Sequence, residues 1–403
     1  MPETTAPTAT DPSATAHPAL AETQRILSRL IAFPSVSSDS NSDLIAWLAG
    51  HLEASGARCE ILESPDGRKA NLWATIGPDR PGGIVLSGHS DVVPVADQDW
   101  TTDPFEMREA DGLLYGRGAC DMKGFIAACV AMAPHFAAAI GDRPDARPVH
   151  FAFTYDEEVG CIGAAHLVEI LRTRPHRPDI AIIGEPTMMK VIEGHKGIYE
   201  CCARFTGLEG HGSAPDKGVS AVEYATRYVS RLLGLREELR GRAPADSRFD
   251  PPWSTVNIGV LHGGAAHNII PGKAVVEWEM RPVQQSDRDL VVDALADLVP
   301  RLDAEMKRTH PGAGILSEVV GEVAGLEPMD DNAARDLVFA LTGANSAETV
   351  AFCTEAGLFQ SMGMDAVICG PGSIEQAHKP DEYVSLSQMS QCLDMLEGLA
   401  LKL

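Results

Sequence analysis

Four short apolar runs in this chain are each followed, within a few residues, by acidic or histidine side chains. The run 84–86 leads to His89 and Asp91, 149–154 to Glu157 and Glu158, 180–183 to Glu185, and 366–369 to His378. Apolar runs that end at glycine or turn residues are typical of buried strands, and helical periodicity returns between them. This alternation indicates an α/β fold with a mixed, mostly parallel sheet sandwiched by helices. Because open α/β sheets hold their sites at the carboxyl ends of strands, we expect these side chains to share one rim.

A further acid, Asp121, reaches the same rim from a glycine-rich turn. The segment Gly116–Gly124 places Asp121 shortly before Phe125–Val130, whose amphipathic pattern predicts the start of a helix. A strand-to-helix loop of this kind would present the Asp121 carboxylate beside the groups at the strand ends.

The order of elements changes between residues 193 and 306. The patterns there follow the order strand, helix, strand, strand, helix, which is typical of an α+β, ferredoxin-like domain with an antiparallel sheet. We therefore predict an inserted domain at 193–306 within a discontinuous catalytic domain formed by 19–192 and 307–403. A strand expected at 314–320 falls in the catalytic domain by this division. Residues 1–18, rich in Thr, Ala and Pro, are predicted to be a flexible leader.

The charge balance limits the possible partners. The 33 Lys and Arg residues against 57 Asp and Glu residues give a net charge of −24, which argues against nucleic acid or an anionic membrane surface. No apolar run approaches the ~20 residues needed to span a bilayer, and the first residues lack the apolar core of a secretory signal. The nine cysteines form no C-x-x-C pair, so we expect no disulfide framework and a cytoplasmic location.

Several carboxylates and two imidazoles on one rim repel or neutralise one another unless cations lie between them. Histidine nitrogen and carboxylate oxygen, without thiolate, are ligands that suit Zn²⁺, Co²⁺ or Mn²⁺. A site for two such ions ~3.5–4 Å apart needs about two terminal ligands for each ion and one bridging carboxylate. Five of the candidates meet that count, and two carboxylates are left over.

The surplus carboxylates have uses of their own. Asp91 stands two residues after His89, where it could hold the second nitrogen of that imidazole. Of the neighbours Glu157 and Glu158, one could bind an ion and the other could act as general base toward a water molecule.

Five motifs, in this order, resemble those of the co-catalytic dizinc amidohydrolases, a family that includes acetylornithine deacetylases, succinyl-diaminopimelate desuccinylases, aminoacylases and several dipeptidases. They are G-H-S-D-V-V-P, G-R-G-A-C-D-M-K-G, Asp-Glu-Glu followed by Gly, G-E-P-T, and G-P-G-S-I-E-Q-A-H-K-P-D-E-Y. The similarity runs from about Ile26 to the end of the chain. Within the family, Thr354–Gly357 and the last motif are most similar to the acetylornithine deacetylases.

The resemblance implies a catalytic domain of the dizinc exopeptidase type and a set of metal ligands. It implies that His89, Asp121 and Glu185 bind one ion, that Asp121, Glu158 and His378 bind the other, and that Asp121 bridges the two. The implied ions are Zn²⁺, for which Co²⁺ can substitute. The peptide bond between Asp121 and the next residue is expected to be cis.

The resemblance also implies roles for residues that bind no metal. Glu157 is implied as the general base and Asp91 as the residue that orients a histidine ligand. The inserted domain is similar to the family's dimerisation domain, which implies a homodimer in which His211 steadies an oxyanion in the partner subunit's site. Asn268 and Arg281 match positions that hold the substrate carboxylate. From residue types alone, His211 could be a turn histidine, and Asn268 and Arg281 could cap a loop and pair with a surface acid.

The implied activity is metal-dependent hydrolysis of N²-acetyl-L-ornithine to acetate and L-ornithine, a step of arginine biosynthesis. Glu355 could face the cationic side chain of such a substrate. Alternatives within the same chemistry are a succinyl-diaminopimelate desuccinylase, an acetylcitrulline deacetylase and a general N-acyl-amino-acid or dipeptide hydrolase. A non-enzymatic binding protein is the alternative from another class, but such a relic would be expected to lose the base, and Glu157 is present.

Overall fold

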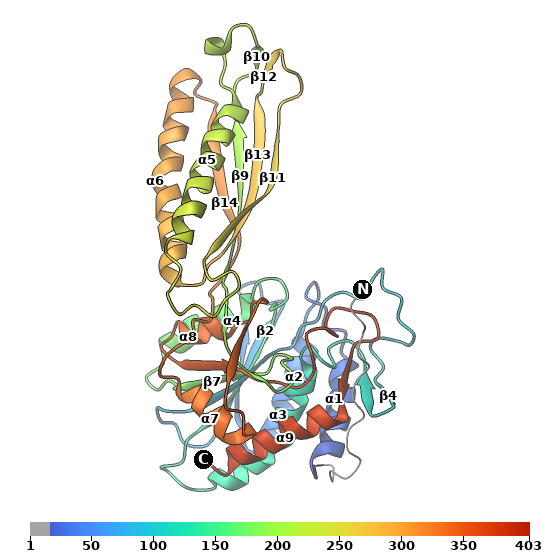
Figure 1. Cartoon of the computed structure of the whole chain (residues 1–403). Coiled ribbons are helices and arrows are strands. Elements are labelled where there is room, and N and C mark those ends of the chain that lie inside the picture. The colour runs from blue at the N-terminus through green and yellow to red at the C-terminus, as the bar shows by residue number, and fades with distance from the viewer. Residues whose placement is uncertain (1–16) are drawn as a thin grey trace, which may run out of the picture. The chain divides into compact units, whose positions relative to one another are not determined.

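The structure is a computed structural model that describes residues 17–403, and these residues form two compact units (Figure 1). Within the described residues, unit 1 comprises 17–192, 331–347 and 362–403, and unit 2 comprises 193–330 and 348–361. Each unit has a hydrophobic core of its own. The predicted leader lies outside the described residues, apart from its last two positions.

Unit 1 is built on a mixed sheet whose central strands are parallel. Its strands are β1 (Arg58–Glu63), β2 (Ala70–Ile76), β3 (Ile84–His89), β6 (Val149–Thr154), β7 (Ile180–Ile183) and β16 (Asp365–Ile368). The sheet also includes β8 (Val191–His195) and β15 (Ala347–Val350), of which only 191–192 and 347 are counted in unit 1. The order across the sheet is β1-β2-β6-β3-β7-β16-β8-β15. Strands β6, β3, β7 and β16 run parallel, whereas β1, β2 and β8 pair antiparallel with their neighbours. The predicted fold class is therefore confirmed, and the carboxyl ends of the four parallel strands meet at one edge.

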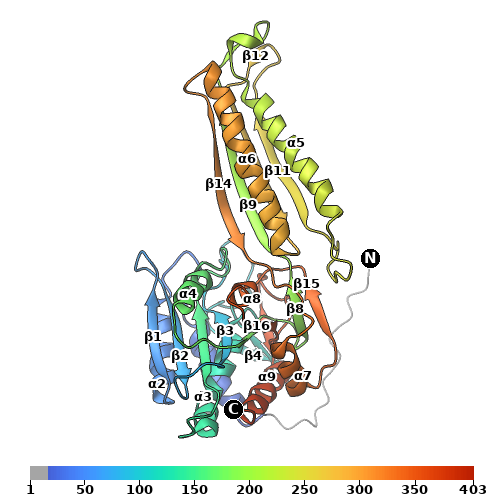
Figure 2. The same ribbon diagram turned by 90° about the vertical axis from the view of Figure 1, so that its left-hand side faces the viewer.

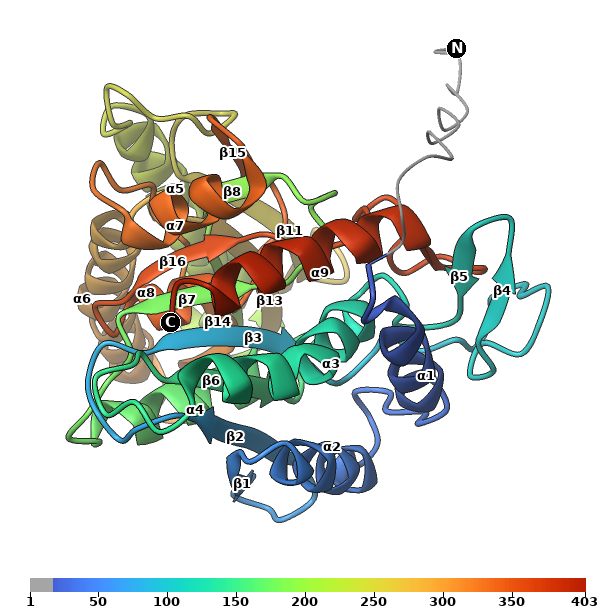
Figure 3. The same cartoon turned by 90° about the horizontal axis from the view of Figure 1, so that it is seen from below.

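Helices cover this sheet and complete the core of unit 1. They are α1 (Leu20–Ile31), α2 (Ser42–Ala54), α3 (Lys123–Ile140), α4 (Ile162–Arg172), α7 (Ala333–Thr342) and α9 (Leu386–Ala400). Helix α3 packs against both α1 and α9, which lie beside it in Figure 3. Among the described residues, α3 is the one helix whose length and hydropathy would allow it to cross a membrane, and 72% of it is buried inside the structure.

A three-stranded sheet in unit 1 joins two segments that are far apart in sequence. Its strands are β4 (Arg108–Ala110), β5 (Leu113–Tyr115) and β17 (Tyr383–Ser385). Because β17 pairs with β5 antiparallel, the end of the C-terminal motif lies beside the chain that leads to Asp121. The sequence analysis did not predict these short strands.

Unit 2 has the order β-α-β-β-α-β of a ferredoxin-like fold. Its main elements are β9 (Ile198–Thr206), α5 (Ala221–Arg240), β11 (Thr255–Gly263), β13 (Lys273–Arg281), α6 (Gln285–Thr309) and β14 (Gly314–Val323). The strands form an antiparallel sheet in the order β11-β13-β9-β14. Helices α5 and α6 lie on the same face of this sheet (Figure 2). Alternate residues of β9, such as Tyr199, Cys201 and Phe205, are buried in the core beneath them.

The predicted end of the inserted domain at residue 306 is wrong. Strand β14, expected in the catalytic domain, pairs along its length with β9 and belongs to unit 2, as do residues 348–361. Without β14, the backbone groups along one side of β9 would lack ladder partners. An apolar pattern shows that a strand forms but does not show which sheet it joins, and this is why the sequence misplaced β14.

Candidate metal centre

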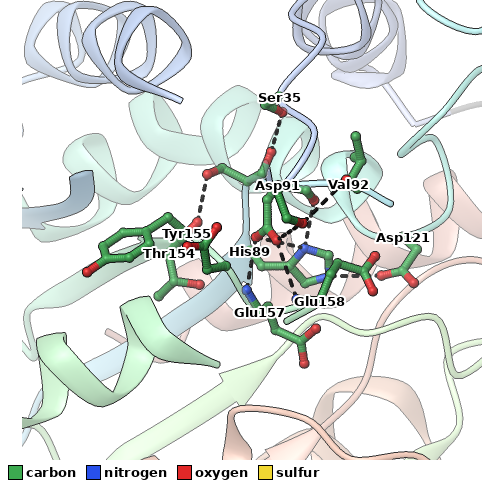
Figure 4. Close-up of polar contacts among 12 residues, drawn as sticks. Ser35, His89, Asp91, Val92, Asp121, Thr154, Tyr155, Glu157 and Glu158 are labelled. Atoms are coloured by element: carbon green, nitrogen blue, oxygen red, sulfur yellow. Dashed lines mark hydrogen bonds and ion pairs between the residues drawn. The ribbon is translucent and has the colours of Figure 1, made fainter. Parts of the chain in front are cut away.

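His89 is the last residue of β3, and its imidazole is 1% exposed. Its Nδ1 lies 2.9 Å from the backbone oxygen of Asp91. A carbonyl oxygen is an acceptor, so Nδ1 carries the proton and the lone pair of Nε2 is free to bind a cation. That Nε2 lies 2.9 Å from Asp121 Oδ1 (Figure 4). It lies 3.8 Å from Glu185 Oε1.

A second set of ligand groups surrounds His378. Its Nε2 lies 3.3 Å from Asp121 Oδ2 and 3.0 Å from Glu158 Oε2. Asp121 thus directs one carboxylate oxygen to each histidine, which is the arrangement that a carboxylate bridging two ions requires. The peptide bond between Asp121 and Met122 is cis, as the resemblance implied.

The distances among these donor atoms suit metal ions. Bonds of ~2.0–2.1 Å to a tetrahedral ion place two donor atoms about 3.3 Å apart, and the four separations above lie between 2.9 and 3.8 Å. The donor atoms of His89, Asp121 and Glu158 all lie within 4.8 Å of one another, and so do those of His89, Glu157 and Glu185. The residues present therefore fit a pair of divalent cations with nitrogen and oxygen ligands.

Protons on the histidines balance the charge of this cluster when no cation is considered. Hydrogen bonds to Asp121 and Glu158 raise the pKa of His378 to about 10. Burial lowers the pKa of His89, but the hydrogen bond to Asp121 and the charge of Glu185 outweigh it and raise that pKa well above its usual value. Burial acts to raise the pKa of Asp121, yet its hydrogen bonds to both histidines hold it below the usual range. A divalent cation in each set would replace these protons.

Glu157 follows β6 and lies beside the ligands. Burial raises its pKa to about 8, and the charge of Glu158 adds to this effect, whereas His89 opposes it. Its Oε1 accepts a weak hydrogen bond from Cys161 Sγ at 3.5 Å. A carboxylate with a pKa near neutrality can take up and release a proton during a reaction, as a general base must.

The Asp91 carboxylate forms the predicted ion pair with His89, but its hydrogen-bond partners lie elsewhere. The Asp91 carboxylate lies 3.7 Å from His89 Nδ1. The backbone oxygen of Asp91 is closer to that nitrogen, at 2.9 Å. The carboxylate instead accepts hydrogen bonds from the backbone nitrogens of Glu157 at 3.1 Å and Glu158 at 3.4 Å, and from Ser37 Oγ at 2.7 Å. Asp91 therefore fixes the turn that carries both glutamates. Nothing in the sequence singled out Ser37, which lies in a loop more than fifty residues earlier.

Glu382 is a second residue that the sequence analysis missed, although it lies inside the last quoted motif. It is 1% exposed, and its carboxylate accepts hydrogen bonds from the backbone of the loop that carries Asp121. A buried acid directly before a short strand carries no sequence signal that distinguishes it from an exposed acid.

The other predicted site residues lie in unit 2. His211, in β10 (Gly210–His211), is exposed and contacts Ser213, and the backbone of Asn268 accepts a hydrogen bond from the residue after His211. Arg281 ends β13 and forms a 2.8 Å ion pair with Glu279. Glu355, just before α8 (Ala356–Gln360), is fully buried. Their roles toward substrate stay predictions.

A further group of potential ligands in unit 1 does not suit a metal. His17, Asp394 and Glu397 have donor atoms within 4.8 Å of one another. The backbone nitrogen of Ala19 donates to His17 Nδ1 at 3.1 Å, so Nε2 of the neutral imidazole carries the proton and points to Glu397 at 3.3 Å. An Nε2–H cannot bind a cation, and the group is better described as a polar contact between His17 and Glu397 beside the start of α1.

Comparison with known proteins agrees with this geometry. The chain is 37% identical to an acetylornithine deacetylase of Photorhabdus laumondii over 366 residues, which cover 89% of this chain and 91% of that protein. It is equally identical to an acetylornithine deacetylase of Proteus mirabilis over 378 residues, with 92% and 94% covered.

Solved structures share the fold at lower sequence identity. Aminopeptidase PepT from Bacillus cereus superposes with a TM-score of 0.69 at 18% identity, covering 95% of this chain and 98% of that one. A metallo-carboxypeptidase from Sulfolobus solfataricus superposes with a TM-score of 0.68 at 17% identity, covering 94% and 98%.

A peptidase family model matches the chain from residue 85 to residue 402, and members of that family generally bind two divalent metal ions. The match covers most of the chain, and this chain belongs to peptidase family M20/M25/M40.

Proposed function

We propose that this enzyme hydrolyses the amide bond of N²-acetyl-L-ornithine, releasing acetate and L-ornithine. The proposal is supported by two relatives, each 37% identical over about nine-tenths of the chain, that carry the name acetylornithine deacetylase. The observation that carries the hydrolytic chemistry is Asp121, whose two oxygens face one histidine each. That geometry is suited to two metal ions acting on one acyl carbonyl.

Five side chains would hold the two ions, which we propose to be Zn²⁺. They are His89 and Glu185 for one ion, Glu158 and His378 for the other, and Asp121 for both. Imidazole with carboxylate is a donor set that Zn²⁺ accepts readily, and Co²⁺ would substitute for it. When bound, such ions lower the pKa of a water molecule and polarise the carbonyl that it attacks.

Glu157 is the proposed general base. Its carboxylate takes a proton from the attacking water as the new C–O bond forms, and returns it to the ornithine nitrogen as the C–N bond breaks. The raised pKa, caused first by burial, suits a group that must both accept and donate a proton near neutrality. Asp91 supports this role because it fixes the backbone of Glu157 through a 3.1 Å hydrogen bond.

Substrate recognition is assigned to residues of unit 2. We infer that Arg281 and Asn268 bind the α-carboxylate, and that Glu355 faces the cationic side chain of the ornithine moiety. A planar guanidinium binds a carboxylate through two parallel hydrogen bonds, which supports the choice of Arg281. The exposure of His211 on β10 is compatible with a role in a homodimer, where it would stabilise the oxyanion in the partner subunit's site.

A cytoplasmic location completes the proposal. All nine cysteines are free in the structure, and most are buried. Free thiols in this number are usual in a reducing compartment.

The test is acetate release from N²-acetyl-L-ornithine by the metal-free enzyme, with and without added Zn²⁺ or Co²⁺. Succinyl-diaminopimelate, acetylcitrulline and acetylmethionine serve as competing substrates. Metal-dependent turnover that is fastest on acetylornithine supports the proposal. Faster turnover of another substrate keeps the chemistry and rejects the substrate, whereas no turnover of any acyl amino acid rejects both. Glu355→Gln lowering activity on acetylornithine and acetylmethionine equally would remove Glu355 from the cationic subsite.

A further inference from the structure

Glu382 organises the loop that presents Asp121. Its Oε1 accepts hydrogen bonds from the backbone nitrogens of Cys120 at 2.8 Å and Asp121 at 3.0 Å. Its Oε2 accepts from the backbone nitrogen of Gly118 at 3.1 Å and from Arg117 Nη1 at 2.7 Å. One buried carboxylate thus satisfies three backbone donors of the loop, and a charged acceptor makes such hydrogen bonds stronger than neutral ones.

Arg117 carries this contact onward to a second loop. The residue is 1% exposed, and its guanidinium stacks over Trp100 with 5.0 Å to the ring centroid. While Nη1 binds Glu382, Nη2 donates to Gln98 Oε1 at 2.5 Å. The planar guanidinium therefore connects the Asp121 loop to the segment that contains Gln98.

Gln98 reaches the backbone of the other ligand. Its Nε2 donates to the carbonyl oxygen of His378 at 2.9 Å. His378 has φ of 63°, a left-handed conformation that a residue with a side chain adopts at a cost unless its surroundings hold it. The contact from Gln98, together with a 3.4 Å contact from Arg117 Nη1 to the carbonyl of Lys379, supplies such support.

We propose that Glu382, Arg117 and Gln98 are positioning residues that set the separation of Asp121 and His378, two ligands of the same ion. The three side chains form one continuous path from the backbone nitrogen of Asp121 to the backbone oxygen of His378. The contacts of this path with Asp121 and His378 are made to their backbone atoms and not to the imidazole or carboxylate atoms that would bind the ion. Gln98 holds His378, a proposed ligand of one ion alone, whereas Glu382 holds Asp121, the proposed bridge of both ions, so the loss of Gln98 is expected to act mainly on one ion.

The inference rests on the proposed metal centre but not on the proposed substrate. Outer residues that orient metal ligands change metal affinity by roughly 10- to 100-fold when they are removed. We therefore expect that Gln98→Ala weakens the binding of one of two Zn²⁺ equivalents by about this factor and leaves the other within threefold. A role confined to folding would lower thermal stability without separating the two equivalents.

The experiment is a titration of the metal-free full chain with Zn²⁺ against a chromophoric chelator, which resolves the two dissociation constants. Gln98→Ala is compared with Gln24→Ala, a half-buried glutamine of unit 1 whose side chain binds Glu109 away from the ligands. Glu382→Gln is measured as a second variant, with the thermal midpoint of each metal-free protein recorded alongside. Gln98 is the more informative position, because it is half-buried and its loss removes no charge.

In Gln98→Ala the binding of one Zn²⁺ equivalent is expected to weaken, whereas in Gln24→Ala neither equivalent should weaken. The thermal midpoints of metal-free wild type, Gln98→Ala and Gln24→Ala are expected to be equal. Equal affinities in Gln98→Ala and Gln24→Ala, or equal weakening of both equivalents, would overturn the inference. Acetate release is recorded separately: a wild-type enzyme that binds two ions but leaves acetylornithine intact rejects the proposed substrate, and the titration still decides the positioning role.

Discussion

Gly184 separates β7 from the ligand Glu185, and adding one methyl group there should disturb both the core and the metal centre. A Cβ at this position would stand 1.9 Å from Cγ of Phe125 and 2.1 Å from its Cδ1. Cβ atoms essentially never make contacts shorter than 3.0 Å, so the ring, the strand end or both must move. Phe125 is fully buried in α3.

The magnitude follows from the packing of this pair. Overpacking a close-packed core costs ~1–3 kcal/mol or more, and a contact this short places Gly184→Ala at about 3 kcal/mol. Phe125→Ala alone should cost ~3–5 kcal/mol, because it removes a buried ring and leaves a cavity. In the double variant the new methyl group enters that cavity, so its cost should stay near that of Phe125→Ala. The two changes should therefore couple by about 3 kcal/mol.

The assay is urea unfolding of the four metal-free proteins, followed by hydrogen exchange and mass spectrometry of peptides from β7 and α3. Local peptides are needed because the chain has two units with separate cores, and a single transition cannot be assumed. Costs that add within 0.5 kcal/mol would refute the argument, since contacting residues are expected to couple and distant ones to add. Zn²⁺ binding of Gly184→Ala gives a second readout, because the displaced strand end carries Glu185.

Three further outcomes are expected. Asp121→Ala should abolish the binding of both Zn²⁺ equivalents, whereas Glu185→Ala should weaken the binding of one. Titration of the metal-free proteins with Zn²⁺ measures both effects. If Asp121→Ala weakened only one equivalent, the two ions would occupy independent sites without a bridge. Glu157→Gln should lower kcat by ~10²–10⁴-fold while both ions remain bound, and the exposed Glu169→Gln is the matched control; a loss of less than tenfold would contradict the role of base. Burial lowers the pKa of His195 to about 4, so between about pH 6.5 and pH 4 the unfolded chain binds a proton that the folded chain does not. The free energy of unfolding should therefore fall by up to about 3 kcal/mol as the pH drops from 6.5 to 4. Unfolding curves measured across this pH range should lose that part of the pH dependence in His195→Gln.

Local sequence patterns were sufficient for most of the elements and for the expectation that the candidate ligands share one rim. The run 149–154 and the run 180–183 became β6 and β7 with the predicted bounds. The side chains after the strands converge because a strand's carboxyl end has one place in a parallel sheet. Thus His89, Asp121 and His378 could be assigned to one site before any distance was known, with the family motifs deciding which ligand shares which ion.

The features that sequence could not provide depend on contacts between distant segments. Strand β14 was expected in the wrong unit, because the choice between two sheets is made by hydrogen-bond partners and not by apolar pattern. The carboxylate of Asp91 lies 3.7 Å from His89, where it was expected, but it also accepts a hydrogen bond from the backbone of Glu157, more than sixty residues away, which the sequence did not indicate. Glu382 and Ser37 looked like ordinary polar residues, because burial is a property of the folded chain.

The order in which unit 1 is assembled has a consequence for synthesis on the ribosome. Strand β16 pairs with β7, and helix α9 packs on α3. Both β16 and α9 come later in the chain than residues 193–330, the main body of unit 2. When residue 330 has been made, unit 2 has all its main strands and both long helices, whereas one side of β7 and much of α3 still lack their partners. Open strand edges and uncovered apolar helices promote aggregation. The nascent chain therefore spends the synthesis of its last seventy or so residues with its smaller unit able to fold and its larger one exposed, and a chain cut short before α9 is expected to be captured by chaperones or degraded.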